Sequence, residues 1–112
     1  MHLITAIIKP HRLEAVTEAL KERGASGLTV SDVQGFGRQG GHSEVYRGSE
    51  YHVDYLPKIR VEVICADADS DAIATLIADT ARTGRIGDGK IWITELVGVL
   101  RIRTGEIGGD AI

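Results

Sequence analysis

The segment Gly84-Arg-Ile-Gly-Asp-Gly-Lys90 has residue types and spacing that suggest phosphate chemistry. It matches the P-loop pattern G-x-x-x-x-G-K-[ST] except at the last position, where Ile91 replaces the Ser or Thr that binds Mg²⁺. A P-loop also follows a strand and opens a helix. Here a helical pattern ending at Ala81 precedes the glycines, and the strand-like Ile91-Trp92-Ile93 follows them. Chemistry and context therefore argue against an NTPase loop.

A different phosphate-binding arrangement remains open for this segment. The glycines at 84, 87 and 89 allow successive backbone N–H groups to form an anion-binding nest, and Arg82, Arg85 and Lys90 add positive charge. Arg101 and Arg103 lie two apart in a strand-like stretch, which predicts that they share one face. The number of cations suits a triphosphate. The alternative is a solvated basic turn whose cations pair with Asp88 and Glu106.

The elements that must position these residues follow from hydrophobic spacing. Apolar or alternating runs predict four strands, and a helical period of apolar residues predicts two helices. Pro10 suits the first helix start, Asp69 or Ser70 can cap the second helix, and Gly24 and Gly84 are the expected stops. The order is βαββαβ, an α+β, ferredoxin-like sandwich. The predicted strands are 3–8, 28–34, 58–65 and 91–97, with a short fifth at 99–103.

Length and composition limit the class of protein. A chain of 112 residues with 43% hydrophobic and 4% aromatic residues predicts a single domain, 1–112, with an aliphatic core. The formal net charge of -3 gives no reason to expect nucleic acid or an anionic membrane as partner. The apolar run 3–8 is too short for a signal peptide or a membrane span, so we expect a cytoplasmic protein. The single Cys65 is expected to be a buried, small apolar residue.

The first and fourth predicted strands are apolar on both faces, although two helices cover only one face of a ferredoxin-like sheet. Trp92 and Leu96 oppose Ile91, Ile93 and Val97. The second face therefore needs another cover. We expect an oligomer to supply it, and the alternative is the chain's own C-terminal segment.

The connection 35–55 is long for so small a domain, and such loops are usually functional or disordered. It contains five glycines, three tyrosines and two histidines, with almost no aliphatic side chain to pack. We expect it to project from the sheet. The alternative is an extended hairpin with tyrosines paired across it.

Several segments, in the right order, resemble the PII nitrogen-regulatory signalling proteins. The two most specific are Tyr46-Arg-Gly-Ser-Glu-Tyr51 and Thr83-Gly-Arg-Ile-Gly-Asp-Gly-Lys-Ile-Trp92. Gly35-Phe-Gly-Arg-Gln39, Asp54-Tyr-Leu-Pro-Lys58 and Arg101-Ile-Arg-Thr-Gly-Glu106 also match. The resemblance covers the whole chain. It implies a homotrimer with ATP or ADP in the clefts between subunits, a T-loop at about 37–55, a B-loop at about 82–90 and a C-loop at about 101–109.

The resemblance also implies residues for the nucleotide site. The nucleotide would contact the start of the T-loop and the B-loop. Two arginines would reach in from the neighbouring subunit, and three sheet residues would surround the adenine end. In chain order the set is Thr29, Gly35, Gly37, Arg38, Gln39, Glu62, Ile64, Gly87, Asp88, Gly89, Lys90, Arg101 and Arg103.

A second ligand implied by the resemblance is 2-oxoglutarate, bound only together with Mg²⁺ and ATP. The Gln39 side-chain oxygen would ligate the metal, which the keto acid would also chelate. Lys58 would pair with the distal carboxylate, Lys9 would lie nearby, and the backbone around Gly40 and Gly41 would fold over the ligand. Mg²⁺ prefers oxygen ligands combined with phosphates over an all-protein cage.

The family resemblance implies a switch that partners read through the T-loop, rather than a turnover enzyme. Partners of the family include ammonium transporters, glutamine-synthetase-modifying enzymes such as the adenylyltransferase, and other nitrogen-metabolism enzymes. Arg47 matches the residue that inserts into the transporter pore, which is the only membrane contact expected. Tyr51 matches the position modified by a nucleotidylyltransferase, through uridylylation or adenylylation, and the alternative is an unmodified aromatic.

The chain departs from the family pattern at three positions. Gly40 stands where Lys is usual, Ile107 where Arg is frequent, and Gly109 where a polar residue is frequent. The first puts the T-loop root and 2-oxoglutarate binding in question, and the others the tip of the C-loop.

Two other classes fit the sequence less well. An ATP-hydrolysing enzyme lacks support, because no carboxylate pair or metal cluster is evident and the four histidines are scattered; at most slow ATP hydrolysis is expected. A ferredoxin-like RNA binder would stack bases on sheet aromatics. Here the predicted sheet offers only Trp92.

Overall fold

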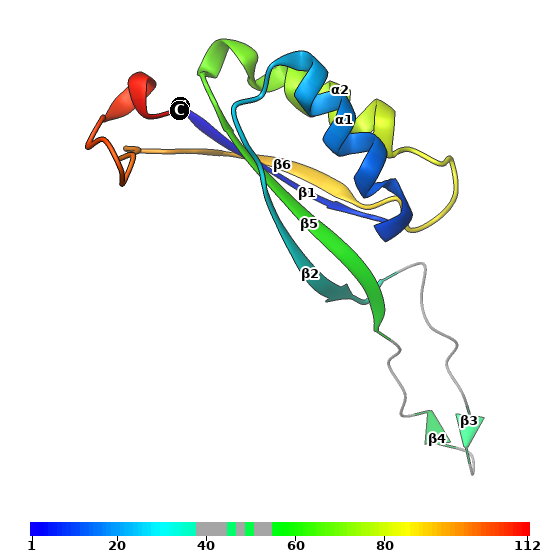
Figure 1. Cartoon of the computed structure of the whole chain (residues 1–112). Coiled ribbons are helices and arrows are strands. Elements are labelled where there is room, and N and C mark those ends of the chain that lie inside the picture. Colours follow the sequence, from blue (N-terminus) through cyan, green and yellow to red (C-terminus); the bar gives the residue numbers. More distant parts are fainter. Residues whose placement is uncertain (38–44, 47–48, 51–54) are drawn as a thin grey trace.

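A computed structural model describes residues 1–37, 45–46, 49–50 and 55–112. Within these ranges the chain forms six strands and two α-helices (Figure 1). Short 3-10 turns at Pro10–Arg12, Asp67–Asp69 and Gly108–Ala111 precede the helices and close the C-terminal segment. The elements are β1 His2–Ile8, α1 Leu13–Arg23, β2 Thr29–Gly35, β3 Val45–Tyr46, β4 Ser49–Glu50, β5 Leu56–Cys65, α2 Ser70–Ala81 and β6 Lys90–Glu95.

Four strands form one antiparallel sheet in the order β2-β5-β1-β6. Thr5 of β1 pairs with Glu62 of β5 and with Trp92 of β6, and Thr29 of β2 pairs with the same Glu62. Counting only these four strands, the spatial order is second, third, first, fourth, which is the predicted ferredoxin-like arrangement. The fold class is confirmed.

The core lies between the sheet and the two helices, which run side by side over one face (Figure 1). Ile4, Ala6 and Ile8 of β1 point toward the helices and are fully buried. Leu20 of α1 and Ile77 of α2 meet them there. Burying a side chain of this size contributes about 2 kcal/mol. Cys65 is 4% exposed and belongs to this core, as predicted.

The ends of α2 differ from the sequence expectation. The side chain of Asp69 makes no capping hydrogen bond at the N-terminus. Ser70 Oγ instead donates to the carbonyl oxygen of Asp67 at 2.8 Å. At the other end the helix stops at Ala81, because Arg82 adopts an extended backbone, so Gly84 does not end it.

The fifth strand predicted at 99–103 is wrong. Only one isolated bridge joins Leu100 and Ile107, and residues 102–104 form a turn. The turn is closed by two backbone hydrogen bonds, from Gly105 N to Arg101 O at 2.8 Å and from Arg101 N to Glu106 O at 2.8 Å. Gly105 has φ +74°, which a strand does not accommodate.

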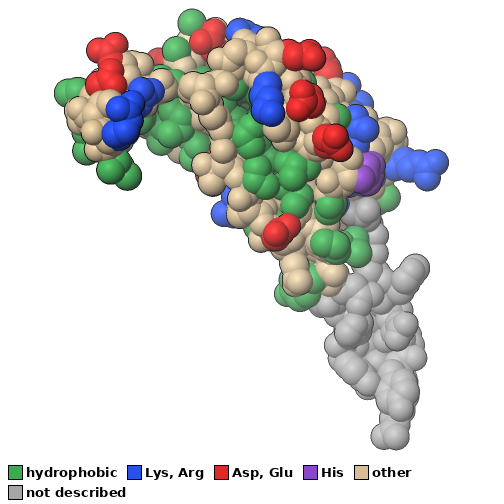
Figure 2. Space-filling view, in the orientation of Figure 1, with side chains coloured by type: hydrophobic (Ala, Val, Ile, Leu, Met, Phe, Trp, Pro, Cys, Tyr) green, Lys and Arg blue, Asp and Glu red, His purple; other side chains and the backbone are tan. Residues whose placement is uncertain are grey.

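Residues 96–112, here called the C-terminal arm, leave the sheet at the end opposite the start of β5 (Figure 1). Its apolar side chains lie largely outside the protomer core: Ile102 is 97% exposed, and Val97, Leu100 and Ile107 are also exposed. Figure 2 shows hydrophobic side chains gathered there beside Lys and Arg. Trp92 on the helix-free face of the sheet is 44% exposed. The arm does not cover this side chain, so the alternative cover considered from the sequence is not complete.

The long connection contains a short antiparallel pairing, in which Val45 faces Glu50 and Tyr46 faces Ser49. Part of the predicted hairpin alternative is therefore correct at the backbone level. At the two roots of the connection, the rings of Phe36 and Tyr55 meet edge to face with centroids 6.4 Å apart. Across the described ranges, the helices are too short and too polar for any of them to traverse a bilayer.

Candidate functional site

Two cavities, each of about 700 Å³, open on the helix-free face of the sheet. The first, here the loop cavity, lies between Gly35–Gly37, Lys58 and residues 86–90. The second, here the arm cavity, lies between Thr29, Glu62, Ile64 and the C-terminal arm. Ile7 lines the first and Leu3 the second. Four residues along one strand separate these two positions by roughly 13 Å.

The B-loop rests directly on the backbone of β1. Gly89 has φ +99°, and a Cβ added there would lie 1.7 Å from the carbonyl oxygen of Ile7. No side chain can occupy that position without moving the strand or the loop. Gly84 and Gly87 also have positive φ values, +83° and +90°. The glycine spacing noted in the sequence thus serves a tight turn held against β1.

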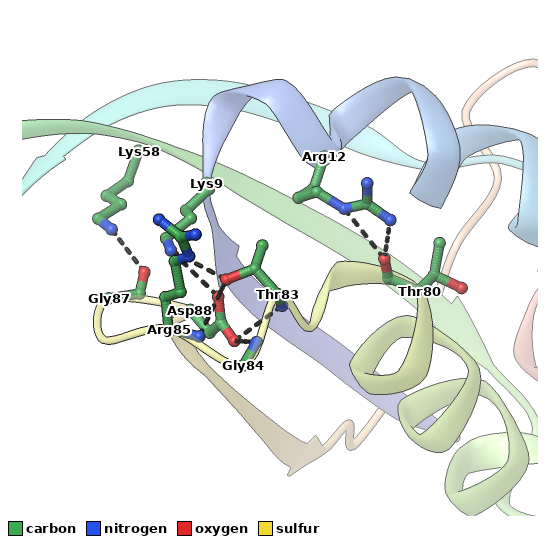
Figure 3. Close-up of polar contacts among 9 residues, drawn as sticks. All are labelled: Lys9, Arg12, Lys58, Thr80, Thr83, Gly84, Arg85, Gly87 and Asp88. Carbon is green, nitrogen blue, oxygen red and sulfur yellow. Dashed lines mark hydrogen bonds and ion pairs between the residues drawn. The ribbon is translucent and has the colours of Figure 1, made fainter.

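A network of hydrogen bonds closes the B-loop from within (Figure 3). The Asp88 carboxylate accepts hydrogen bonds from the backbone N–H groups of Thr83 and Gly84, each at 2.9 Å, and from the Thr83 hydroxyl. Thr83 Oγ1 in turn accepts from Arg85 N at 3.2 Å. Lys9 Nζ lies 3.1 Å from Thr83 Oγ1 and 3.3 Å from Asp88 Oδ1. The Thr83 hydroxyl and these donors hold the pKa of the Asp88 carboxyl well below its usual range.

Lys58 joins the B-loop to the root of the T-loop. It is 8% exposed, and its Nζ donates to the carbonyl oxygen of Gly87 at 2.7 Å (Figure 3). Burial lowers the pKa of Lys58, and the positive charge of Lys9 lowers it further, whereas Asp88 opposes the shift. A nearby anion would therefore stabilise the charged form of Lys58.

The arm cavity is lined by two arginines, and among the described residues its polar contacts are simpler than those of the loop cavity. Arg101 Nη2 donates to the Ile112 carbonyl oxygen at 2.8 Å, and Arg101 Nη1 lies 3.6 Å from Glu106. The pairing of Arg101 with Glu106 matches one part of the basic-turn alternative. The other part differs, because the partner of Asp88 is Lys9 and not a cation of the B-loop.

The structure divides the predicted site residues into two sets. Gly35, Gly37, Lys58 and residues 87–90 line the loop cavity, and Lys9 contacts Asp88 beside it. The arm cavity is lined by Thr29, Glu62, Ile64, Arg101 and Arg103. The family resemblance placed only the two arginines on a neighbouring subunit, whereas all five residues line one cavity of a single chain. Six further predicted residues lie outside the described part of the chain: Arg38, Gln39, Gly40, Gly41, Arg47 and Tyr51.

The sequence analysis did not predict the part that Thr83 takes in the hydrogen bonds of the B-loop. The signal available was a hydroxyl residue just ahead of the glycines and five residues before an aspartate, but the contact depends on how the turn folds back. Among the described residues, no group of three or more His, Cys, Asp or Glu could hold a metal ion.

Comparison with known proteins identifies the class. The family model of nitrogen regulatory protein P-II matches residues 1–106. The nitrogen regulatory protein P-II of Rhizobium meliloti is 56% identical, that of Azospirillum brasilense 55%, and the nitrogen regulatory protein GlnK of Escherichia coli 55%. Each alignment spans 112 residues and covers all of both chains. The chain therefore belongs to the nitrogen regulatory protein P-II family, whose members are named as regulators rather than enzymes.

Proposed function

We propose that this chain is a nitrogen-regulatory signalling protein that binds ATP or ADP at sites shared between the subunits of a homotrimer. With Mg²⁺ and ATP present it also binds 2-oxoglutarate, and it acts on its partners through the T-loop. It is a regulator, with at most slow ATP hydrolysis.

The observation that carries the proposal is the separation of the predicted nucleotide residues into two cavities. The loop cavity supplies Lys90, Lys58 and a glycine turn suited to phosphate oxygens. The arm cavity supplies Arg101 and Arg103. Neither cavity holds all the predicted groups, and both open on the same face of the sheet. A second copy that applies its arm cavity to the first copy's loop cavity brings them together.

The exposed apolar side chains support assembly of the chain with itself. Trp92 on the helix-free face, and Val97 and Ile102 on the arm, are exposed in the protomer. Their burial against other copies supplies an apolar driving force of about 25 cal/mol per Å². A cyclic trimer uses the same pair of surfaces three times and leaves neither one open.

The residues present suit the proposed ligands. Arginine and lysine side chains with backbone N–H groups form charge-assisted hydrogen bonds to phosphate oxygens. Lys58 has a lowered pKa in a buried position. A carboxylate near it restores the preference for the charged ammonium, which suits the distal carboxylate of 2-oxoglutarate. The Gln39 side-chain oxygen would ligate Mg²⁺, and the metal would supply positive charge for the phosphates and the keto acid.

Signal output follows from the position of Lys58 at the root of the T-loop. Lys58 lies on β5, two residues after the strand begins, and it donates to the B-loop. An effector that engages Lys58 couples ligand binding to the direction in which the T-loop leaves the sheet. The effector shifts this equilibrium only by its difference in affinity for the two states. The partners proposed to read the loop are an ammonium transporter, through Arg47, and glutamine synthetase adenylyltransferase or other nitrogen-metabolism enzymes in the cytoplasm.

Tyr51 is proposed as the target of a nucleotidylyltransferase. Mass spectrometry of Tyr51 from nitrogen-starved cells tests this point independently of ligand binding. An unmodified tyrosine under starvation contradicts it.

Titration calorimetry tests the ligand scheme. We expect ADP and ATP to bind alone, and 2-oxoglutarate to bind only with Mg²⁺ and ATP. Gln39→Glu should abolish the ternary complex while ADP still binds. Binding of 2-oxoglutarate to the nucleotide-free protein contradicts the scheme, and rapid ATP turnover favours an enzyme.

A further inference from the structure

Thr83 and Asp88 form the centre of a clasp that spans the B-loop. The carboxylate at the far end of the turn accepts hydrogen bonds from two backbone N–H groups at its start, and the Thr83 hydroxyl adds a third. Arg85 N donates to the same hydroxyl oxygen at 3.2 Å. The first three N–H groups of the turn, at residues 83, 84 and 85, are therefore engaged inside the clasp.

The clasp is attached to the end of β1. Lys9 follows the strand directly, is 9% exposed, and contacts both Thr83 and Asp88 (Figure 3). Gly89 lies against the carbonyl oxygen of Ile7 two residues earlier. Both ends of the B-loop are thus held by the same short piece of sheet, while Gly87 and Gly89 line the loop cavity.

Asp88 is poorly suited to touch a phosphate itself. A carboxylate facing a phosphate repels it, and in partly buried surroundings the repulsion is not fully screened. In this structure the carboxylate instead faces Thr83, Gly84 and Lys9, all of which donate to it or carry positive charge. The low pKa of Asp88 agrees with a carboxylate that stays ionised within this set of donors.

We infer that Thr83 and Asp88, anchored by Lys9, are positioning residues that preshape the B-loop for the phosphates of an adenine nucleotide. This inference rests on the nucleotide binding proposed above and adds residue roles to it. Thr83 carries no other assigned role. Asp88, which the family resemblance placed among the nucleotide contacts, and Lys9 then act on the nucleotide through the B-loop and not by contact.

The test compares ADP with adenosine, which lacks phosphates. Thr83→Val removes the hydroxyl with little change of shape, and Thr83 is exposed, so the fold is retained. Loss of a charge-assisted network of this kind is expected to weaken ADP binding about tenfold or more. Adenosine binding should stay within about twofold, because the clasp acts only on the phosphate end.

Three further variants complete the design. Thr83→Ser keeps the hydroxyl and should restore ADP affinity. Thr75→Val makes the same chemical change at an exposed position of α2 and should leave ADP affinity unchanged. Asp88→Asn should weaken ADP, because an amide cannot accept from all the donors. If Asp88 instead faces the phosphates, removing its charge tightens ADP binding, and this result overturns the inference.

Amide hydrogen exchange of residues 83–85 in the nucleotide-free protein supplies a second readout. We expect faster exchange in Thr83→Val and Asp88→Asn than in wild type or Thr83→Ser. Unchanged exchange and unchanged ADP affinity in Thr83→Val overturn the clasp, as does an equal loss for ADP and adenosine. If the wild-type chain binds no ADP, the proposed function fails, and the exchange data alone then decide whether the clasp holds the loop.

Discussion

The residues around the two cavities on the helix-free face make different kinds of contact. Around the loop cavity, Asp88, Thr83 and Lys9 contact one another, and Lys58 donates to the Gly87 carbonyl oxygen, all within one chain. Around the arm cavity, Arg101 reaches the arm's own carbonyl at Ile112 and the neighbouring Glu106. The apolar side chains of that arm face outward.

This difference indicates which part of the proposed site one protomer already forms by itself. The loop cavity has its shape in the protomer, because backbone and side-chain contacts within 83–90 and β1 determine it. The arm beside the arm cavity instead carries exposed apolar side chains, among them Val97 and Ile102, which the proposed assembly would bury. A ligand that needs both therefore reports on assembly as well as on its own concentration.

The largest effect is expected when two variants, each defective in one of the two cavities, are mixed. Lys90→Ala damages only the loop cavity and Arg103→Ala only the arm cavity. Each homotrimer is expected to lose ADP affinity roughly 100-fold, because each loses a charge-assisted phosphate contact. In a mixed trimer, one site combines an intact loop with an intact arm from different protomers. High-affinity ADP binding should therefore return on co-refolding, as measured by calorimetry.

The control is Lys90→Ala co-refolded with a separately tagged copy of itself, which should not regain high-affinity ADP binding. If mixed Lys90→Ala and Arg103→Ala trimers form but recover no binding, each site lies within one chain and the proposed arrangement is wrong.

Substitution of two glycines of the B-loop tests, through the free energy of unfolding, whether the loop rests on β1. In Gly89→Ala the new Cβ meets Ile7 O at 1.7 Å in addition to the unfavourable φ of +99°, so we expect a loss of about 3 kcal/mol. In Gly84→Ala the φ of +83° is unfavourable but nothing lies within 4 Å, so the loss should be about 1 kcal/mol. Urea unfolding measures both. Equal losses indicate that the B-loop does not rest on β1.

Much of the fold was predictable because it depends on local patterns. The period of Val16 and Leu20 and the alternation from Ile59 to Cys65 describe faces that a helix or a strand must bury. The start of β5 at Leu56 was not predicted, because the alternation of apolar and polar residues begins only at Lys58. Pro57 lies ahead of it, and a proline is unusual inside a strand. It is tolerated near the strand end, where its partner is Gln34.

The site was less predictable because its contacts join distant parts of the chain. The glycine spacing identified the B-loop, but it did not show that Lys9, more than seventy residues away, would pair with Asp88. The helix end at Ala81 has the same origin. The N–H groups of Thr83 and Gly84 bind the Asp88 carboxylate instead of continuing the helix. For residues 101–103, Gly105 and Gly108 were turn signals that outweighed the alternating pattern.

A third prediction concerns the exposed side of the arm. Val97→Ser and Ile102→Ser change side chains that are exposed in the protomer, so far-ultraviolet circular dichroism should not change. Burial of one such side chain in the proposed trimer should contribute about 2 kcal/mol, so each variant should weaken association roughly 30-fold. Light scattering over a dilution series measures this. Leu20→Ala is the matched core variant and should lower the unfolding free energy by about 3 kcal/mol.

The smallest expected effect is the acid response of the loop cavity. The pKa of Asp88 is lowered in the folded protein, so its stabilisation is complete above its ordinary value of about 4 and is lost as the pH falls through the lowered value. The charged groups facing it are Lys9 from the end of β1 and Lys58 from β5. Wild type should therefore lose urea resistance more steeply than Asp88→Asn between about pH 4 and pH 2.

The emission of Trp92, which lines the loop cavity, can follow this unfolding. Asp67 also has a lowered pKa, through its bond to the Met1 amino group, and titrates in both proteins. The difference between wild type and Asp88→Asn thus isolates the B-loop. Asp71→Asn, on the exposed start of α2, should follow wild type. Parallel acid curves for wild type and Asp88→Asn would mean that the carboxylate is not held by the clasp, and the preformed character of the loop cavity would then need another cause.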